Sequence, residues 1–446
     1  MWPHKFQCTI AFIICSFSFS SISYGISEEF LRIISNTTLE QEQTFEAEKK
    51  IIEAIQDRKV DESDYKPIVE GEFTGSLLLY DNFRKDKGLS DKDKHDFSLT
   101  SILKVYDFGR KDLIYDSADK SIEIQHVNLL KVKNKEAERL YKIISDYDYA
   151  SRKMDKLNDY ETFLNSQGDK IRDKFNLGGG TVLELNQFEQ LVNGFILQRQ
   201  SIARDLRDAK AQYNLYFSVP FRKNVFPAEA ELAARAYNIT GNPFKSIEYN
   251  LEEELLDLEI RKSRLEQAVT SSEMFPDLTL GLKLTKFDVL STANDFEVRA
   301  TATSKLNFFD GFRRKYTVKG QSERIAALAA QLRNAKLLKD QRLAQYLIRY
   351  QNLDDEALIE VEKKQKSKND WDIAKEMSSV TSLDLGTEIR YASSILSSEL
   401  RLMDIEAEKG LLLIQGISVQ GKLSEFFIIP DQNTENPADT YCLLRS

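Results

Sequence analysis

The chain has 446 residues, of which 30% are charged, and it carries a formal net charge of −9 at pH 7. This acidic balance argues against a nucleic-acid partner, because phosphate binding depends on clustered Lys and Arg side chains. Only eight residues are proline and the mean hydropathy is negative, a composition that suits long solvated helices better than compact cores.

Residues 1–25 have the pattern of a secretory signal peptide. Lys5 lies in a short N-terminal region, residues 10–19 are mostly apolar, and Ser23 and Gly25 place small residues at positions −3 and −1 of a cleavage site. The apolar run is too short for a membrane-spanning helix, which needs about 20 such residues. The sequence therefore predicts export. No later segment reaches 18 apolar residues, so a bilayer crossing would have to use strands of a closed barrel.

The first third of the chain predicts one helix followed by two strands. Residues 26–58 are acidic and amphipathic, which is typical of a helix, and Pro67 then ends helix formation. Residues alternate in polarity over 67–80 and again over 97–106, which predicts two strands with one apolar and one polar face. The highly charged residues 81–96 between them predict a loop in water.

Residues 107–218 are predicted to form a helical hairpin. Apart from Gly109, roughly 60 residues contain neither proline nor glycine, and at about 1.5 Å per residue they predict a helix about 90 Å long. Three consecutive glycines in the segment 175–181 predict the turn. Apolar residues then recur with alternating spacings of three and four, interrupted by Arg199 alone, which is typical of a coiled-coil seam. This seam consists of Leu185, Phe188, Val192, Phe195, Arg199, Ile202, Leu206, Ala209, Tyr213 and Tyr216.

The second half of the chain repeats the first. Residues 103–111 align without gaps on residues 306–314, an offset of 203 (310 − 107). Strands are predicted at about 276–286 and 295–309, followed by a second helical hairpin at about 310–418. The predicted parts are a signal peptide (1–25), a first strand–hairpin repeat (26–218), an equatorial connector (219–247), a second strand–hairpin repeat (248–419) and an irregular C-terminal tail (420–446).

The predicted fold class is mainly α with a small β part. Four strands of about ten residues are long enough to cross a bilayer, but about eight are needed to close even a small barrel. Three copies would supply twelve strands and as many long helices around one axis. The alternative is a soluble protein in which the strands belong to an ordinary sandwich and the helices form a plain coiled coil. Export, the repeat and the helix length together favour the tube.

The sequence resembles the TolC-type outer-membrane efflux and secretion channels over nearly the whole mature chain. The resemblance rests on the prolines before the strand pairs, Pro67 and Pro276, on residues 106–110 (YDFGR) and 309–313 (FDGFR) at the strand–helix junctions, and on residues 175–185 (FNLGGGTVLEL) at the hairpin tip. It implies a homotrimer with a 12-stranded barrel in outer-membrane lipid and a periplasmic helical barrel. It also implies that the helix tips meet a periplasmic adaptor and an inner-membrane transporter.

The resemblance implies a constriction at the periplasmic tip, where acidic residues of this family form rings. Residues 181–185 (TVLEL) match residues 381–385 (TSLDL) at an offset of 200, so Glu184 and Asp384 occupy the family's acidic positions. Thr387 stands where a second acid is expected, and the second repeat lacks the tip glycines. Alternatively, the two acids are first-turn residues favoured by the helix dipole. The tip-turn residues assigned to adaptor contact are Gly178, Gly179, Gly180, Thr181 and Thr381.

No constellation predicts catalysis, so an enzyme is not expected and neither a cofactor nor a metal is predicted. His95 lies in a charged segment and His126 lies within a long helix, without a set of potential ligands near either in the sequence. The three tip glycines do not form a phosphate loop, because no Lys-Ser or Lys-Thr follows them.

The predicted function is an outer-membrane exit duct of a tripartite efflux or type I secretion system. A periplasmic adaptor is one alternative, although adaptors flank one hairpin with two halves of a β domain, whereas here a strand pair precedes each of two hairpins. A coiled-coil structural protein without a channel is the other alternative.

Overall fold

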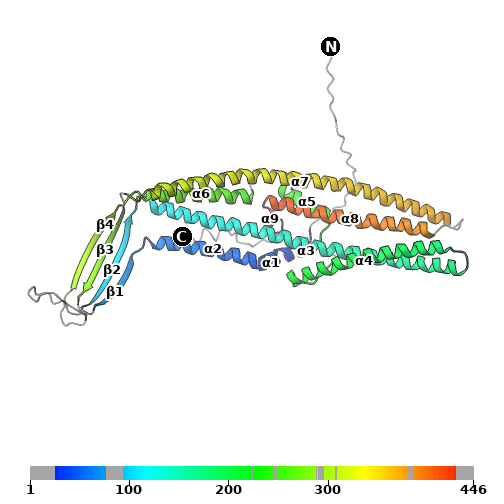
Figure 1. Ribbon diagram of the computed structural model, residues 1–446, viewed down its shortest axis with the longest axis horizontal. Coiled ribbons are helices and arrows are strands. Elements are labelled where there is room, and N and C mark those ends of the chain that lie inside the picture. Colours follow the sequence, from blue (N-terminus) through cyan, green and yellow to red (C-terminus); the bar gives the residue numbers. More distant parts are fainter. Residues whose placement is uncertain are drawn as a thin grey trace, which may run out of the picture.

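The chain is an elongated molecule with a small sheet at one end and long helices that extend away from it (Figure 1). The computed structural model describes residues 26–76, 94–222, 225–245, 250–287, 289, 296–306, 309–378 and 385–427. The predicted signal peptide lies outside these ranges. The mainly α fold with a small β part, as predicted from the sequence, is confirmed.

The sheet contains four antiparallel strands in the order in which they occur along the chain. They are β1 (Ile68–Ser76), β2 (Lys94–Tyr106), β3 (Asp277–Lys286) and β4 (Phe296–Lys305). The prediction of a water-exposed loop at 81–96 is wrong at its C-terminal end, since β2 already begins at Lys94. His95 pairs with Gly75 and Asp96 pairs with Thr74, so the antiparallel ladder continues into the charged segment. Polar side chains are compatible with a strand whose face is in water.

Both outer edges of this sheet are open in the single chain. Among the described residues, β1 pairs only with β2, and β4 pairs only with β3. The apolar face is open as well, because Val69, Phe73 and Val298 are 61%, 62% and 58% exposed. Within the described residues of one chain, the apolar face and both edges of this sheet are therefore uncovered.

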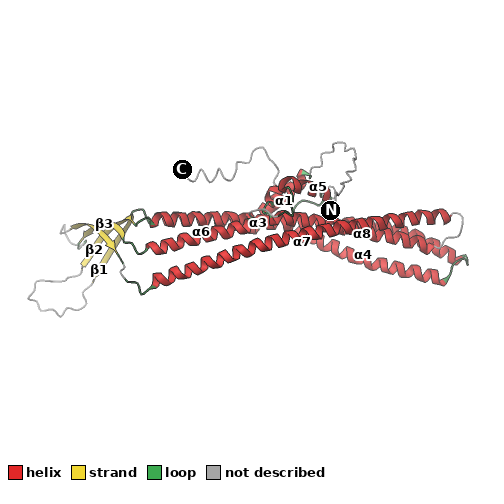
Figure 2. Ribbon diagram, turned by 90° about the horizontal axis from the view of Figure 1, so that it is seen from above, coloured by secondary structure: helices red, strands yellow, loops and turns green. Residues whose placement is uncertain are grey.

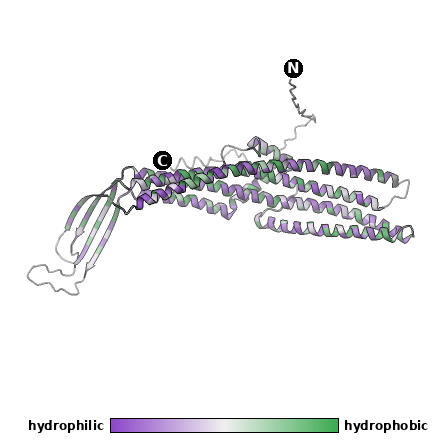
Figure 3. Ribbon diagram, turned by 45° about the horizontal axis from the view of Figure 1, so that its top comes forward, coloured by the Kyte–Doolittle hydropathy of each residue, from purple (hydrophilic) through white to green (hydrophobic). Residues whose placement is uncertain are grey.

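Two helices dominate the rest of the molecule: α3 (Arg110–Asn176) has 67 residues and α7 (Arg313–Ser378) has 66. At about 1.5 Å per residue, each is about 100 Å long. Figure 3 shows hydrophilic and hydrophobic residues interspersed along both, as expected for helices that pack through narrow stripes. None of the helices in the described ranges is long and apolar enough to span a membrane.

Shorter helices lie one after another along the two long helices α3 and α7 (Figure 2). The helices α2 (Glu42–Ser63) and α4 (Val182–Tyr216) lie along α3, whereas α6 (Leu251–Ser272) and α8 (Leu385–Val419) lie along α7. Because α3 also packs against α6 and α8, the helices form one curved layer. One edge of this layer is α7, and the opposite edge is α2 with α4.

The prediction of one helix over residues 26–58 is wrong, because the chain forms α1 (Glu28–Glu40) and then α2. Gln41 between them is extended, with φ −68° and ψ 137°. Threonine hydroxyls bond to nearby main-chain carbonyls at the break: Thr38 donates to Ile34 and Thr44 donates to Thr38. Such local bonds compete with the helical pattern and favour an interruption.

The duplication seen in the sequence is repeated in the backbone. The pair Ile68 and Ile102 in the β1–β2 ladder corresponds to the pair Asp277 and Lys305 in the β3–β4 ladder. Corresponding residues of β1 and β3 are 209 positions apart in the sequence (277 − 68), and those of β2 and β4 are 203 positions apart (305 − 102). The same offset of 203 separates the first residues of α3 and α7 (313 − 110).

The main hydrophobic core lies midway along the molecule, where α1, α5 (Glu229–Thr240) and α9 (Leu423–Phe427) pack against the long helices. Phe30 and Tyr141 are almost fully buried and meet Phe226 with ring centroids 5.7 and 5.8 Å apart. The prediction of an irregular tail from Gln420 is wrong for residues 423–427, which form a helix in this core. The remainder of the predicted tail, residues 428–446, lies outside the described residues.

We expect Phe426→Ala to reduce the free energy of unfolding by about 3–5 kcal/mol, because the fully buried ring would leave a cavity. Glu425→Ala in the same helix removes an exposed side chain and is the matched control. Thermal unfolding followed by helical circular dichroism measures both. Equal effects of the two substitutions would contradict this assignment of α9 to the core.

Candidate functional site at the hairpin tip

The first hairpin turns in a Schellman motif immediately after α3. Gly178 has a φ of 77°, and its N–H donates to the carbonyl of Phe175. The N–H of Gly179 donates to the carbonyl of Lys174, so two of the otherwise unpaired carbonyls at the helix end are satisfied. A positive φ at this position favours glycine, which explains why one glycine of the turn is required.

A second glycine of the turn is required by space. A Cβ atom at Gly180 would lie 3.0 Å from Cα of Phe175 and 3.1 Å from its nitrogen, both of which belong to the backbone. At Gly179, by contrast, a Cβ atom would meet only ordinary contacts at 3.6 and 3.7 Å. The three glycines that the sequence presents as one motif are therefore not equivalent: Gly178 is favoured by its positive φ, Gly180 by the close Phe175 backbone, and Gly179 by neither.

The return helix α4 begins in a capping box, with Thr181 as its N-cap residue. The backbone N–H of Glu184 donates to the Thr181 hydroxyl at 3.2 Å, and the backbone N–H of Thr181 donates to the Glu184 carboxylate at 3.1 Å. These reciprocal bonds satisfy two N–H groups at the helix start. The predicted constriction residue Glu184 thus has a structural partner within its own turn.

Glu184 also joins the two helices of the hairpin. Its carboxylate lies 3.4 Å from Nζ of Lys174 near the end of α3. The hydrogen bond from the Thr181 backbone lowers the pKa of Glu184 from its ordinary value, and the positive charge of Lys174 lowers it further. Glu184 therefore stays ionised at neutral pH, as a charged ring would require.

The seam below the tip confirms the predicted heptad pattern. Phe188 and Phe195 are buried against residues of α3 and α8. The hairpin helices approach closely at Gly168, where an added Cβ atom would lie 2.8 Å from the Phe188 ring. Arg199, the polar residue of the predicted seam, forms an ion pair with Glu161 of α3 at 3.2 Å.

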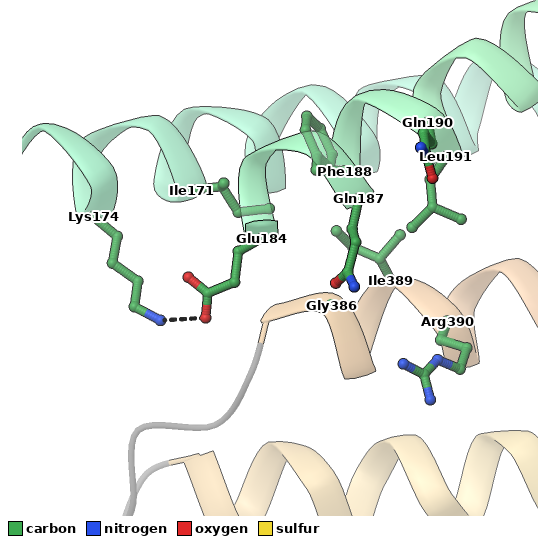
Figure 4. A pocket seen from close by; sticks show the side chains of 10 residues that line it. All are labelled: Ile171, Lys174, Glu184, Gln187, Phe188, Gln190, Leu191, Gly386, Ile389 and Arg390. Atoms are coloured by element: carbon green, nitrogen blue, oxygen red, sulfur yellow. Dashed lines mark hydrogen bonds and ion pairs between the residues drawn. The ribbon is translucent and has the colours of Figure 1, made fainter. Parts of the chain in front are cut away.

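A cleft of about 320 Å³ lies between this hairpin and the start of α8 (Figure 4). Its apolar lining comes from both sides, with Ile171, Phe188 and Leu191 on the first hairpin and Ile389 on α8. The charged lining is formed by Lys174, Glu184 and Arg390. An apolar cleft edged by both signs of charge can receive an amphipathic segment of a partner protein.

The structure brings together the predicted residues of the first hairpin tip. Those of the second tip are described only in part. Gly178, Gly179, Gly180, Thr181 and Glu184 form one continuous turn. Thr387 lies in the first turn of α8, next to Gly386, which lines the cleft. Asp384 and Thr381 lie outside the described residues, so the assignment of Asp384 to a constriction stays a prediction.

Sequence reasoning missed two charged residues of this site, Lys174 and Arg390, which both line the cleft. It also passed over Glu388, an acid in the first turn of α8 that lies one residue after Thr387. Lys174 had a usable signal, since it precedes the glycines at the end of a long helix, where cations are favourable.

Comparisons with known proteins support the fold. No protein-family model matches the sequence, and no curated protein matches it. Solved structures match over most of the chain. The CusC structure, described as a transmembrane channel, has a TM-score of 0.74 at 12% identity and covers 88% of this chain and 92% of its own. The Campylobacter jejuni CmeC outer membrane channel has a TM-score of 0.73 at 12% identity, covering 98% and 97%.

The open state of the Neisseria gonorrhoeae MtrE outer membrane channel gives a TM-score of 0.70 at 13% identity, covering 94% of this chain and 98% of its own. The chain therefore has the fold of these outer-membrane channels, as the resemblance predicts. Since the similarity reaches nearly from end to end, the two-hairpin architecture and the sheet are both shared.

We expect Gly178→Ala and Gly180→Ala to loosen the tip, whereas Gly179→Ala leaves it almost unchanged. The first substitution places an L-residue at positive φ, at a cost of about 1–2 kcal/mol, and the second displaces the Phe175 backbone. Amide hydrogen exchange in peptides that cover residues 174–186 measures the effect. Equal protection in all three variants would contradict this difference between Gly179 and the other two glycines.

Proposed function

We propose that the protein is an outer-membrane exit duct that assembles as a homotrimer. In this assembly the four-stranded sheets of three copies form a 12-stranded barrel in outer-membrane lipid, and the helices form a tube across the periplasm. The observation that carries the proposal is the open sheet at one end of two helices, α3 and α7, that are each about 100 Å long. The fold that the chain shares with outer-membrane channels supports the same conclusion.

The two open strand edges are the physical reason for self-association. In hydrocarbon, each unpaired backbone N–H or C=O costs several kcal/mol, because no water is present to bond it. Four strands cannot close on themselves, since about eight are needed to fill a small barrel. Further strands must come from other copies, and three copies supply twelve.

The repeat predicts how the edges of two copies pair. Within one chain, β2 of the first repeat pairs with β3 of the second, with Leu99 opposite Leu284 and Ile102 opposite Gly281. Applying the strand offsets of 203 and 209 to these pairs gives their counterparts on β4 of one copy and β1 of the next. Ala302 then lies opposite Gly75, and Lys305 lies opposite Glu72.

This register satisfies two independent requirements. It places the polar faces of β4 and β1 on the same side of the barrel, which a shift by one residue would not do. It also sets the opposite charges of Lys305 and Glu72 across from each other, an arrangement that stabilises neighbouring strands. The apolar residues Val69, Phe73 and Val298 then share the other face, which suits contact with lipid.

The helical layer offers matching edges. On α7, Leu358 and Ile359 are 65% and 62% exposed, and on α4, Leu197 and Leu215 are 68% and 74% exposed. Exposed apolar side chains at both edges of a layer are suited to contact between copies. A ring of three layers would enclose a tube continuous with the barrel.

A role as an exit duct implies partners at the far end of the tube. We infer that the tip turn and the cleft beside it receive a periplasmic adaptor, which links the duct to an inner-membrane transporter for efflux or type I secretion. The turn residues Gly178–Thr181 and Thr381 are the proposed contact. An adaptor role for this chain is less well supported, because the chain has two hairpins with one strand pair before each.

The constriction proposed for the tip consists of Glu184 and Asp384 from each copy, with Thr387 nearby. Six carboxylates around a narrow path would attract cations, since charges of one sign focus the field in a pore. The capping box of Glu184 does not exclude this role, because a carboxylate can cap a helix and still carry its charge toward water.

We expect the protein extracted in mild detergent to have the mass of three chains, because open edges are then paired. Unboiled samples should migrate differently from boiled ones on denaturing gels, as closed barrels do. Light scattering coupled to size exclusion measures the mass. A folded, monodisperse monomer would contradict the proposed architecture.

We expect the double change Glu184→Gln and Asp384→Asn to lower the cation preference of channels in planar bilayers. Thermal stability should change little, because Gln at position 184 can still accept the capping-box hydrogen bond. Glu189→Gln, which removes one exposed acid further along α4, is the matched control. Unchanged selectivity together with a marked loss of stability would show that the acids are helix caps and nothing more.

A further inference from the structure

The junction between the sheet and the helices contains one arginine that ties the two repeats together. Arg110, the first residue of α3, is 12% exposed and reaches the end of α6. Its guanidinium donates to the Ser272 hydroxyl at 3.2 Å, to the Ser272 carbonyl at 2.9 Å and to the Phe275 carbonyl at 3.2 Å. It also pairs with Asp277 at 2.9 Å. We call this set the Arg110 contact.

The acceptor side of the Arg110 contact is present twice in the chain. At the end of α6 the Ser272 hydroxyl donates to the Val269 carbonyl at 2.7 Å, and the Phe275 N–H donates to the Ser272 carbonyl at 3.0 Å. At the end of α2, Ser63 donates to Val60 at 2.7 Å, and Lys66 donates to Ser63 at 3.0 Å. Each turn is followed by a proline, Pro276 or Pro67, at the offset of 209 (276 − 67).

The donor side is present twice as well. Arg110 follows two residues with positive φ, and its N–H donates to the Asp107 carbonyl at 3.3 Å. Arg313, the first residue of α7, also follows two residues with positive φ, and its N–H donates to the Asp310 carbonyl at 3.3 Å. Positive φ is uncommon for phenylalanine, yet Phe108 and Phe312 both adopt it, so the two junctions share a strained backbone path.

Only one of the two possible contacts is made within a single chain. The Arg313 side chain is exposed, and no described residue accepts a hydrogen bond from its guanidinium. Ser63 and Lys66 at the end of α2 are also exposed. Arg313 cannot reach Ser63 and Lys66 of its own chain, because α7 and α2 lie at opposite edges of the helical layer (Figure 1).

We propose that Arg313 of one copy binds the end of α2 in the next copy, through the Ser63 hydroxyl and the carbonyls of Ser63 and Lys66. This inference rests on the proposed trimer and names an interaction that fixes the neighbouring chain. A cation at a helix C-terminus is favourable, and the fork of five guanidinium N–H groups suits several acceptors at once. Ile68 occupies the position that corresponds to Asp277, so this contact uses carbonyls and a hydroxyl without a carboxylate.

The test is cross-linking between two differently tagged chains in one cell. All three natural cysteines are replaced by serine, one chain carries Arg313→Cys and the other carries Lys66→Cys. A bifunctional thiol reagent about as long as an arginine side chain is expected to join the two tags. As a control for reagent reach, a single chain with Arg110→Cys and Phe275→Cys should be linked internally.

The Arg313 contact would be overturned if the control chain were linked internally while the two tagged chains formed a trimer without a link between them. That result would leave the exit duct intact. A folded monomer would overturn both proposals. In the uncross-linked protein, Arg313→Ala and Arg313→Lys are both expected to lower the temperature at which the trimer dissociates, because one ammonium cannot replace the fork. Lys315→Ala, which removes an exposed cation two residues further along α7, should leave that temperature unchanged.

Discussion

The outer edges of β1 and β4 dominate the architecture of this chain, because their backbone N–H and C=O groups are left without a neighbouring strand in the described sheet. A sheet of four strands leaves two edges unpaired, and each edge can be satisfied in lipid only by another strand. In the proposed trimer the repeat meets this requirement, since the β2–β3 ladder inside a chain provides a pattern for a β4–β1 ladder between chains. Strand pairing also positions the long helices, because α3 follows β2 and α7 follows β4 along the chain.

Midway along the molecule, packing of a different kind holds the layer together. The core around Phe30, Tyr141 and Phe426 joins residues from both ends of the described chain. A buried ion pair, Lys339 with Glu253 at 2.7 Å, links α7 to the start of α6. Breaking one side of such a pair leaves an uncompensated buried charge, so the pair fixes how the two helices align. The core therefore sets the position of the junction at one end and the tip at the other.

Much of the fold could be predicted from the sequence, because strand alternation, proline positions and the 3–4 spacing are local signals. The split of the first helix at Gln41 could not, since it depends on threonine hydroxyls that bond to nearby carbonyls. The helix at 423–427 is too short to give a periodic signal, and its burial depends on distant parts of the chain. At the tip, Glu184 was found by its motif, whereas the place of Arg390 depends on the packing of α8 against the first hairpin.

Closure of several copies into one barrel fixes the register between β4 of one copy and β1 of the next. Disulfide formation in a cysteine-free chain that carries Ala302→Cys and Gly75→Cys measures this register. Directly opposite residues lie about 4.5–5.5 Å apart, within reach of a disulfide, whereas diagonal neighbours are about 7–8 Å apart. We expect covalent trimers on denaturing gels with this pair, and none when Phe73→Cys replaces Gly75→Cys. Covalent trimers with Phe73→Cys, or folded protein without links in either variant, would rule out the proposed register.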